Sequence, residues 1–425
     1  MFLIINSSMS IASNAEWEKQ KNQPIVQIAN SYPITNKIQT ILNEVNEEIL
    51  EDFLINLVSF SPRYTGTTGC EMTAAYIHQQ FENNGLQTRY QEWSSFGNRY
   101  HPKFFSSQNV EATHPGTQTN HIILFGAHYD TVQQTPGAND DGSGTAAVLA
   151  AAYILSKYSF NHTLKFVTFS GEEIGLKGSG AYAKEAYQNN NNILFMFNAD
   201  MIGRATTKEG GRNMGFSITE DAFWVMDIFQ SINFSLNLQT TFNQYTINRD
   251  GTGHSDYFPF ATYGWETVAC WQGEGDPNMH TEQDGLDNVN FSYLVKTTKC
   301  IIGTLAYLAD ATDIYPQISI ETPKRESIYN HGMKIGCTSQ LTSLIFNEFS
   351  VHAINNHDEI FPIERVEFYF DNILEYTDTA PPFKWYCNKW SCGPHRITII
   401  AYDHIGQKTT NYIDIMYINL RSKLY

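Results

Sequence analysis

Apolar residues in the first three quarters of the chain recur with two different periods, which predict helices first and then strands and helices in alternation. From Ile41 to Phe60 and from Glu71 to Asn84 the period is close to that of an α-helix, and Gly85 is suited to end the second helix. From Asn120 onward, apolar strand-like runs alternate with helical stretches, in the order HIILFGAHYD, GTAAVLAAAYILSKY, TLKFVTFS and ILFMFNADMIG. The strands are almost entirely apolar, as expected of strands covered on both faces. This alternation predicts an α/β fold with a mixed, mostly parallel central sheet flanked by helices.

The last quarter of the chain has a different pattern. After about Asp313 the helical period stops, and short alternating segments such as RVEFYFD and HRITIIAYD stand between turn-rich loops. Their spacing is typical of a β-sandwich, and this part resembles the immunoglobulin-like modules appended to many extracellular enzymes. We therefore predict an N-terminal tail or leader remnant over residues 1–35, an α/β domain over residues 36–313, and an all-β immunoglobulin-like sandwich over residues 314–425.

Length and charge narrow the classes of function. A chain of 425 residues exceeds one ordinary core and suggests two or three domains. The formal net charge of -17 opposes binding to nucleic acid and anionic membranes, because affinity for polyanions depends on Lys and Arg. No apolar run has the length of a membrane span. We expect no nucleic-acid partner and no transmembrane segment.

The cysteines and the start of the chain bear on location. The six cysteines are too scattered for a disulfide scaffold, and Cys387 and Cys392 either bridge the end of a hairpin or remain two free thiols. The start, MFLIINSSMSIASNA, has a short apolar run without a preceding Lys or Arg, which suits the remnant of a secretory leader. We expect a secreted or extracytoplasmic protein.

Five short segments place a metal-competent side chain at the end of a predicted strand or in a loop that can reach it, and this edge of an open α/β sheet is where ligands gather. In GAHYD, His128 can offer a neutral imidazole to zinc, and Asp130 is placed to accept the other ring N–H and orient the ring. In the Gly-rich turn PGANDDGSG, Asp140 is our candidate for a carboxylate that bridges two cations, while Asp141 is suited to cap the following helix. Phosphate binding is disfavoured in this turn, because the Walker lysine is absent and paired aspartates repel phosphate.

The other three segments supply the remaining candidates. Adjacent carboxylates in extended chain point in different directions, so in FSGEEIGL we assign Glu173 to the metal and Glu172 to the general base. Asp200 ends a strongly apolar strand, where a buried carboxylate needs a partner such as a cation. His280 lies in the polar loop DPNMHTEQD and is free to approach a site built by other segments. Each segment alone is more often an acidic turn, a helix start or a solvated histidine, but five such accidents together are much rarer than one shared metal site.

Together the five candidate ligands offer two imidazoles and three carboxylates without a thiolate. This donor set suits a co-catalytic pair of Zn²⁺ ions bridged by one carboxylate and a water or hydroxide. Such a pair lowers the pKa of the water and polarises a carbonyl, while Glu172 takes the proton of the water and later delivers it to the leaving amine. The pattern predicts metal-assisted hydrolysis.

These segments, in this order, resemble the di-zinc exopeptidase family that includes aminopeptidase S, aminopeptidase Y and the bacterial leucyl aminopeptidases (metallopeptidase family twenty-eight). The likeness covers about residues 36–313, and it extends to RYTGTTG from Arg63, to Asn109-Val110 and to Ser255-Asp-Tyr257. The resemblance implies a zinc exopeptidase fold with one zinc on His128 and Asp200, a second zinc on Glu173 and His280, Asp140 bridging both, Glu172 as general base, and Asp130 orienting His128.

The chain departs from the family at one position. Some relatives have a tyrosine four residues before the Asp of the Ser-Asp segment, where it supports the developing oxyanion, but this chain has Thr252. Tyr257 and Tyr263 are alternative donors, so the oxyanion donor stays open.

Several functions remain compatible with the resemblance. It implies first an aminopeptidase that removes N-terminal residues from peptides, although the family also includes carboxypeptidases and dipeptidases. Glutaminyl cyclases share the scaffold and perform acyl transfer at one zinc, but the complete NDDGSG turn favours the peptidase. A non-catalytic binding protein is a third alternative, against which the retention of every ligand and of the base argues. The candidate roles of the β-sandwich over residues 314–425 are contact with a surface, a carbohydrate or a protein, or only packing against the enzyme.

Overall fold

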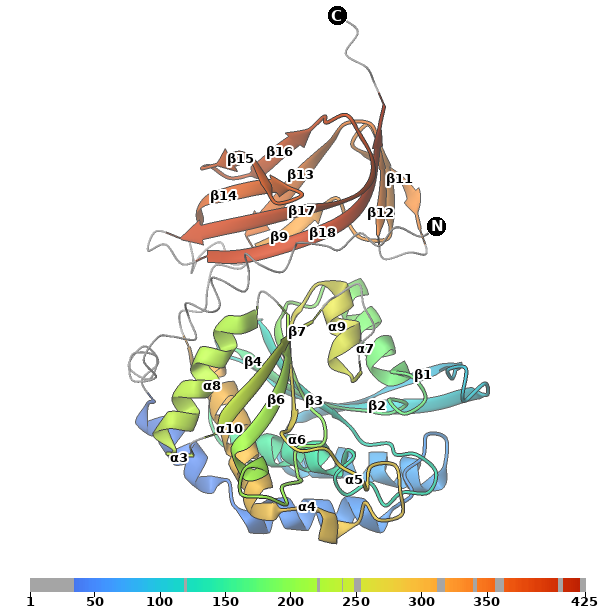
Figure 1. The fold of residues 1–425 in the computed structure, drawn as a ribbon, viewed down its shortest axis with the longest axis vertical. Helices are drawn as coiled ribbons and strands as arrows, with labels where there is room; N and C mark the ends of the chain where they lie inside the picture. The colour runs from blue at the N-terminus through green and yellow to red at the C-terminus, as the bar shows by residue number, and fades with distance from the viewer. Residues whose placement is uncertain are drawn as a thin grey trace, which may run out of the picture.

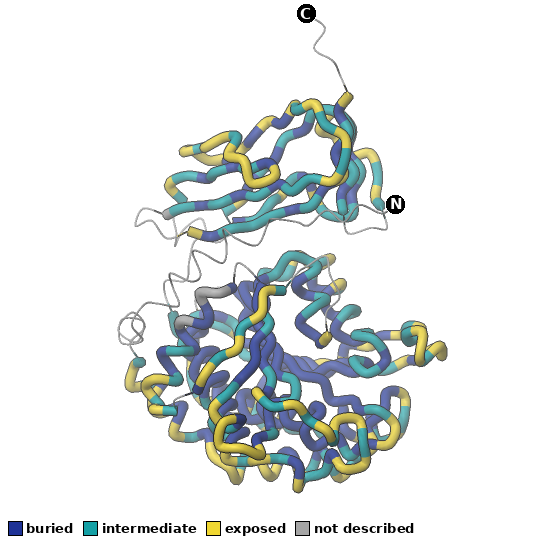
Figure 2. The backbone as a smooth tube through the Cα atoms, in the orientation of Figure 1, coloured by how far each residue is buried: buried dark blue, intermediate teal, exposed yellow. Residues whose placement is uncertain are grey.

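The computed structural model describes residues 34–420 except 118–120, 220–221, 239, 248–253, 312–317, 339–341, 356–362 and 404–407. The predicted tail over residues 1–35 therefore lies almost wholly outside the described residues. Figure 1 shows an α/β part followed along the chain by a β-rich part, and Figure 2 shows that each has its own buried interior. None of the helices in the described ranges is long and apolar enough to cross a membrane.

The α/β part is built on one mixed sheet of eight strands, in the spatial order β1-β2-β4-β3-β5-β8-β6-β7. The four central strands are β4, β3, β5 and β8, and they pair in parallel, whereas β2 and β6 join them antiparallel on either side. The predicted mixed, mostly parallel sheet is confirmed. The strands are β1 (Gln87–Phe96), β2 (Phe104–His114), β3 (Ile122–His128), β4 (Thr163–Phe169), β5 (Ile193–Ala199), β6 (Asn213–Ile218), β7 (Thr241–Thr246) and β8 (Glu266–Gln272).

Helices cover both faces of this sheet (Figure 1). The larger core lies on the face covered by α3, α4, α5, α6, α8 and α10, and the smaller core on the face covered by α7 and α9. Because both faces are covered, β3 and β5 are buried along their whole length. The helices are α3 (Asn36–Glu44), α4 (Glu47–Ser59), α5 (Thr68–Asn83), α6 (Gly142–Leu155), α7 (Lys177–Gln188), α8 (Phe223–Ser235), α9 (Tyr257–Tyr263) and α10 (Phe291–Asp310).

The N-terminal helices differ in detail from the prediction. The single helix expected from Ile41 to Phe60 is two helices, because Asn46 leaves helical geometry and its side chain accepts a hydrogen bond from the N–H of Ile49 at 3.1 Å. The apolar period continues through the break because both helices pack on the same core. The next helix, α5, ends as predicted before Gly85, whose φ of 72° suits a glycine at that position.

The C-terminal part consists of a seven-stranded sheet in the order β11-β10-β12-β18-β17-β14-β15 and a three-stranded sheet in the order β16-β13-β9. Buried and less buried positions alternate along β13 and β14, and the buried ones share one core between the sheets. The predicted all-β region is confirmed, and its immunoglobulin-like character stays a prediction. The strands are β9 (Ile318–Thr322), β10 (Ser327–Asn330), β11 (Met333–Cys337), β12 (Ser343–Phe346), β13 (Phe349–Asn355), β14 (Ile363–Phe370), β15 (Ile373–Asp378), β16 (Phe383–Cys387), β17 (Ser391–Asp403) and β18 (Lys408–Asn419).

All six cysteines are free thiols, so Cys387 and Cys392 do not bridge the turn between β16 and β17. The pKa of the buried Cys387 thiol is raised to about 11 by burial. Burial therefore keeps Cys387 in the neutral thiol form at ordinary pH.

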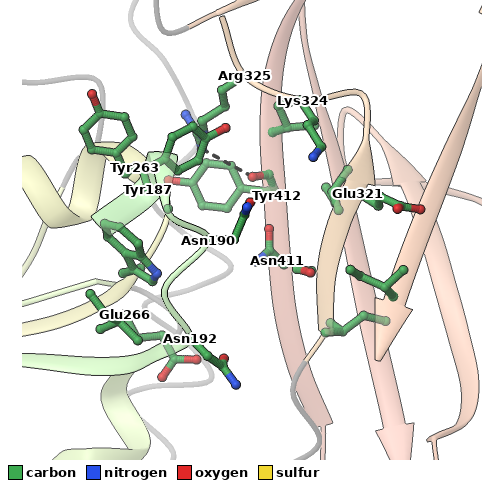
Figure 3. A pocket seen from close by; sticks show the side chains of 18 of the residues that line it. Tyr187, Asn190, Asn192, Tyr263, Glu266, Glu321, Lys324, Arg325, Asn411 and Tyr412 are labelled. Atoms are coloured by element: carbon green, nitrogen blue, oxygen red, sulfur yellow. Dashed lines mark hydrogen bonds between the residues drawn. The ribbon is translucent and has the colours of Figure 1, made fainter. Parts of the chain in front are cut away.

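A cleft of about 880 Å³ separates the two parts (Figure 3). Tyr187 and Tyr263 line it from the α/β part, and Arg325 and Tyr412 line it from the β-rich part. Arg325 reaches the end of α9, where its Nε would lie 3.8 Å from a Cβ atom placed on Gly264. None of the five predicted metal ligands lines this cleft.

Candidate metal centre

All five predicted ligands come together at the carboxyl edge of the parallel strands. His128 is the last residue of β3, Asp200 directly follows β5, and Glu173 lies in the loop after β4. Asp140 lies in the turn between β3 and α6, and His280 lies in the loop between β8 and α10. Segments far apart in sequence therefore meet because parallel strands present their ends at one edge.

Asp140 stands between the two histidines. One of its oxygens lies 3.4 Å from Nε2 of His128, and the other lies 3.1 Å from Nε2 of His280. Asp200 completes the first group at 3.7 Å from His128 Nε2, and Glu173 completes the second at 3.2 Å from His280 Nε2. Within each group the potential ligand atoms lie within 4.8 Å of one another. The shared carboxylate is the geometry expected of a bridging ligand.

The residues fit a pair of zinc ions. They are nitrogen and oxygen donors in two groups of three, which leaves room for water or substrate at each ion. Oε1 of Glu173 is buried and has no hydrogen-bond partner among the described residues. A buried carboxylate oxygen without a donor is costly unless a cation satisfies it.

The ring of His128 is held differently from the prediction. Its Nδ1 lies 3.1 Å from the backbone oxygen of Asp130, whereas the nearest carboxylate oxygen of Asp130 is 3.7 Å away. That carboxylate instead accepts hydrogen bonds from the hydroxyl of Thr65 at 2.8 Å and from the N–H of Glu172 at 3.2 Å. Asp130 thus links the strand end that bears His128 to the loop that bears the proposed base.

The turn that carries Asp140 is fixed by two side chains, Asp284 and Arg63, to which the sequence analysis assigned no role. The carboxylate of Asp284 accepts the backbone N–H groups of Asn139 and Asp140, each at 3.0 Å. The fully buried guanidinium of Arg63 donates to the backbone oxygens of Pro136 and Gly137, each at 2.8 Å. Arg63 lies in the RYTGTTG segment, which the sequence analysis singled out, whereas nothing in the sequence distinguishes Asp284 from the other acidic residues of its polar loop.

Asp141 caps α6, as the sequence predicted. One of its oxygens accepts the N–H of Gly144 at 2.9 Å and also the N–H of Met201 at 3.1 Å. Its other oxygen accepts the N–H of His128 at 3.3 Å. One buried carboxylate therefore ties the ends of β3 and β5 to the start of the helix.

The electrostatics of the centre favour bound positive charge. Burial lowers the pKa of His128, but Asp130, Asp140 and Asp200 outweigh burial and raise it well above its usual value. Asp140 and Glu173 together raise the pKa of His280 to about 10. Concentrated carboxylates in a poorly solvated site attract a proton or a metal cation.

Three carboxyl groups near the centre have a raised pKa. Burial raises the pKa of Glu172 well above its usual value, and it also raises that of Glu173. Burial raises the pKa of the fully buried Asp256 to about 7. Asp256 lies in the Ser255-Asp-Tyr257 segment, and the sequence analysis gave Asp256 itself no catalytic role. A carboxyl group whose pKa is raised toward neutrality is suited to accept and return protons.

The two alternative oxyanion donors differ in position. Tyr263 lines the cleft between the two parts, and its ring centroid lies 4.8 Å from that of Tyr187 (Figure 3). Tyr257 is buried at the first turn of α9, directly after Asp256. Thr252, which stands where some relatives have the tyrosine, lies outside the described residues.

A parallel sheet whose carboxyl edge gathers two imidazoles and three carboxylates defines the class of α/β metallohydrolases. Comparison with known proteins makes the class specific. Residues 109–305, which lie within the α/β part, match the model of peptidase family M28.

Individual relatives agree with this match. Leucine aminopeptidase 1 of Ajellomyces capsulatus (strain NAm1 / WU24) is 27% identical over 299 residues, which cover 64% of this chain and 74% of that protein. A zinc aminopeptidase from Bacillus subtilis superposes with a TM-score of 0.55 at 16% identity, over 64% of this chain and 97% of its own. A glutaminyl cyclase from Fimbriiglobus ruber superposes with a TM-score of 0.54 at 16% identity, over 62% of this chain and 96% of its own. These two structural likenesses show the shared fold.

Proposed function

We propose that this chain is a zinc-dependent aminopeptidase in which Glu172 is the general base. The observation that carries the proposal is the carboxylate of Asp140, which is shared between two three-ligand groups. The match of residues 109–305 to peptidase family M28 and the leucine aminopeptidase relatives support the same activity. Two Zn²⁺ ions would be held by His128, Asp140 and Asp200 and by Asp140, Glu173 and His280.

The metal ions and the residues around them would have separate roles in hydrolysis. The zinc pair would supply a water of lowered pKa and an electrophile for the peptide carbonyl. Glu172 accepts a proton from the attacking water and returns it to the nitrogen of the leaving amine as the peptide C–N bond breaks. The N–H of Glu172 is held by Asp130, so the base is fixed relative to the ligand His128. We propose Tyr257 rather than Tyr263 as the donor to the oxyanion, because Tyr263 faces the cleft between the two parts.

Hydrolysis of a panel of aminoacyl arylamides and N-blocked peptides tests this function. We expect cleavage of substrates with a free amino end, loss of activity with a zinc chelator and recovery with zinc. Glu172→Gln should reduce kcat by at least about a hundred-fold, which is the usual scale for a positioned general base. The control is Glu48→Gln, the same chemical change at an exposed position in the first turn of α4. Wild-type turnover in Glu172→Gln would refute the general-base assignment, and cleavage of only N-blocked substrates would refute the aminopeptidase assignment.

Cyclisation of N-terminal glutamine is the alternative reaction on the same fold. It needs one zinc, whereas both ligand groups around Asp140 are complete here. Ammonia release from a peptide that begins with glutamine, without peptide-bond cleavage, would favour the cyclase.

We also propose that the protein acts outside the cytoplasm. The apolar start of the chain and the likeness of its C-terminal region to modules of extracellular enzymes support this location. Cell fractionation with an antibody to the chain tests it, and recovery of all the protein in the cytoplasm would contradict it.

A further inference from the structure

The hairpin of β1 and β2 is an arm that projects beyond the carboxyl edge of the sheet (Figure 1). β1 and β2 pair over their full length, from Gln87 opposite Thr113 to Phe96 opposite Phe104. β2 pairs with β4 only from Val110 onward, and Val110 lies opposite Thr168, next to the last residue of β4. The first six residues of β2 therefore extend past the edge where the metal ligands gather.

The arm is packed against the loop that carries Glu172 and Glu173. The indole N–H of Trp93 on β1 donates to the hydroxyl of Ser170 at 2.9 Å. The indole ring covers Gly171, since a Cβ atom on that glycine would lie 2.6 Å from the ring. Gly171 also has a φ of 76°, which suits glycine and allows the chain to turn directly under the indole.

The far end of the same loop is held by the arm as well. The backbone N–H of Asn98 donates to the oxygen of Ile174 at 2.9 Å. The side chain of Ile174 is fully buried in a small cluster with Trp93, Phe105 and Tyr64, apart from the two main cores of the α/β part. Ile174 directly follows Glu173, so the arm fixes the residues on both sides of the two glutamates.

We propose that Trp93 is a positioning residue, which sets the place of Glu172 and Glu173 through Ser170, Gly171 and Ile174. This inference rests on the proposed function, and it concerns the loop rather than the metals themselves. Groups that orient metal ligands from outside the ligand set affect metal affinity and activity by about ten- to a hundred-fold. Loss of the indole should weaken the group that contains Glu173 more than the group of His128 and Asp200.

The experiment compares Trp93→Leu and Trp93→Phe with the wild type. After dialysis against a chelator at a concentration where the wild type keeps two zinc ions, Trp93→Leu should keep about one. Its kcat on an aminoacyl arylamide should fall about ten-fold, with KM changed less than about two-fold. Trp93→Phe keeps an aromatic ring over Gly171 and should keep both ions and more than about a third of kcat.

The matched control is Trp385→Leu, because Trp385 in the β-rich part is exposed to the same 7% as Trp93. It should keep both zinc ions and the wild-type kcat. Equal zinc retention and equal kcat in Trp93→Leu and Trp385→Leu would overturn the inference. If Trp93→Leu does not fold, Trp93→Met, which also lacks a ring over Gly171 but fills more of the space, replaces it, and wild-type zinc retention in that variant would likewise overturn the inference. The wild type is measured first, so a wild type without two zinc ions or without peptidase activity counts against the proposed function instead.

Discussion

Replacing Arg63 by methionine should lower the free energy of unfolding of the α/β part by about 3 kcal/mol. The guanidinium of Arg63 is fully buried and donates to three backbone oxygens, on Tyr129 at 2.7 Å and on Pro136 and Gly137 at 2.8 Å. The oxygens of Pro136 and Gly137 keep second donors, the Ser61 hydroxyl and the N–H of Gly142, so the loss is that of three hydrogen bonds to a charged group, each worth about 1.5–3 kcal/mol. Methionine carries no charge, so the variant also avoids the cost of burying a cation, which offsets part of this loss. We therefore take about 1 kcal/mol for each lost hydrogen bond.

Urea unfolding followed by tryptophan fluorescence measures this change. Arg365→Met is the control, because Arg365 on β14 is partly exposed and its pairing with Glu367 should contribute less than about 1 kcal/mol. Arg63→Met should also lower kcat/KM by about ten-fold or more, because the turn with Asp140 loses its anchor. A loss of stability below about 1 kcal/mol, or a loss equal to that of Arg365→Met, would refute the structural role of Arg63.

Three further predictions follow from the contacts of other residues. Asp284→Ala removes the acceptor of two backbone N–H groups at Asp140 and should lower kcat/KM by about 10- to 100-fold, as measured on an arylamide; unchanged kcat/KM would contradict this role. After zinc is removed with a chelator, the stabilisation that protonated His280 contributes should be complete below about pH 6.5. It should fade as pH rises through the raised folded pKa of about 10. Thermal unfolding between pH 6 and pH 11 measures this loss of stability, and a rise in stability through that window would contradict the prediction. His395→Ala removes two hydrogen bonds of 2.6 Å, to Ser391 and to Asp371, and should destabilise the β-rich part by about 1–2 kcal/mol in calorimetry while arylamide turnover stays at the wild-type value; unaltered stability would show that these bonds contribute nothing net.

The sequence was sufficient for the parallel strands and for the clustering of the ligands. The apolar runs that lead to His128 and Asp200 are confirmed as β3 and β5. A strand covered on both faces is almost entirely apolar, so its sequence is easy to recognise. Once those strands are parallel, their carboxyl ends must lie together, and the five candidate ligands follow.

The sequence was insufficient where side chains act through the backbone. The predicted contact between the carboxylate of Asp130 and His128 is replaced by the backbone oxygen of Asp130, because that carboxylate is taken by Thr65 and Glu172. Neither partner of Asp130 is visible in the spacing of the motif. The anchoring role of Asp284 depends in the same way on how a loop folds onto a distant turn.

The arm was missed for a different reason. Residues of β1 such as Gln91 and Trp93 alternate with exposed polar ones, and strand pairs with mixed surfaces give a weaker signal than apolar runs. The prediction began its strands at Asn120 and so lost the element that holds Glu172 and Glu173. The aromatic and β-branched residues of QTRYQEWSSF were the available signal.

Counting bound zinc tests the central claim most directly. Elemental analysis of the purified protein, saturated with zinc and freed of excess, should give two zinc ions for each chain. His280→Ala, which removes a ligand from one group only, should give one ion, and Asp140→Ala, which removes the shared ligand, should give fewer than one after the same treatment. A single zinc ion in the wild type that persists in His280→Ala would contradict a shared two-zinc centre.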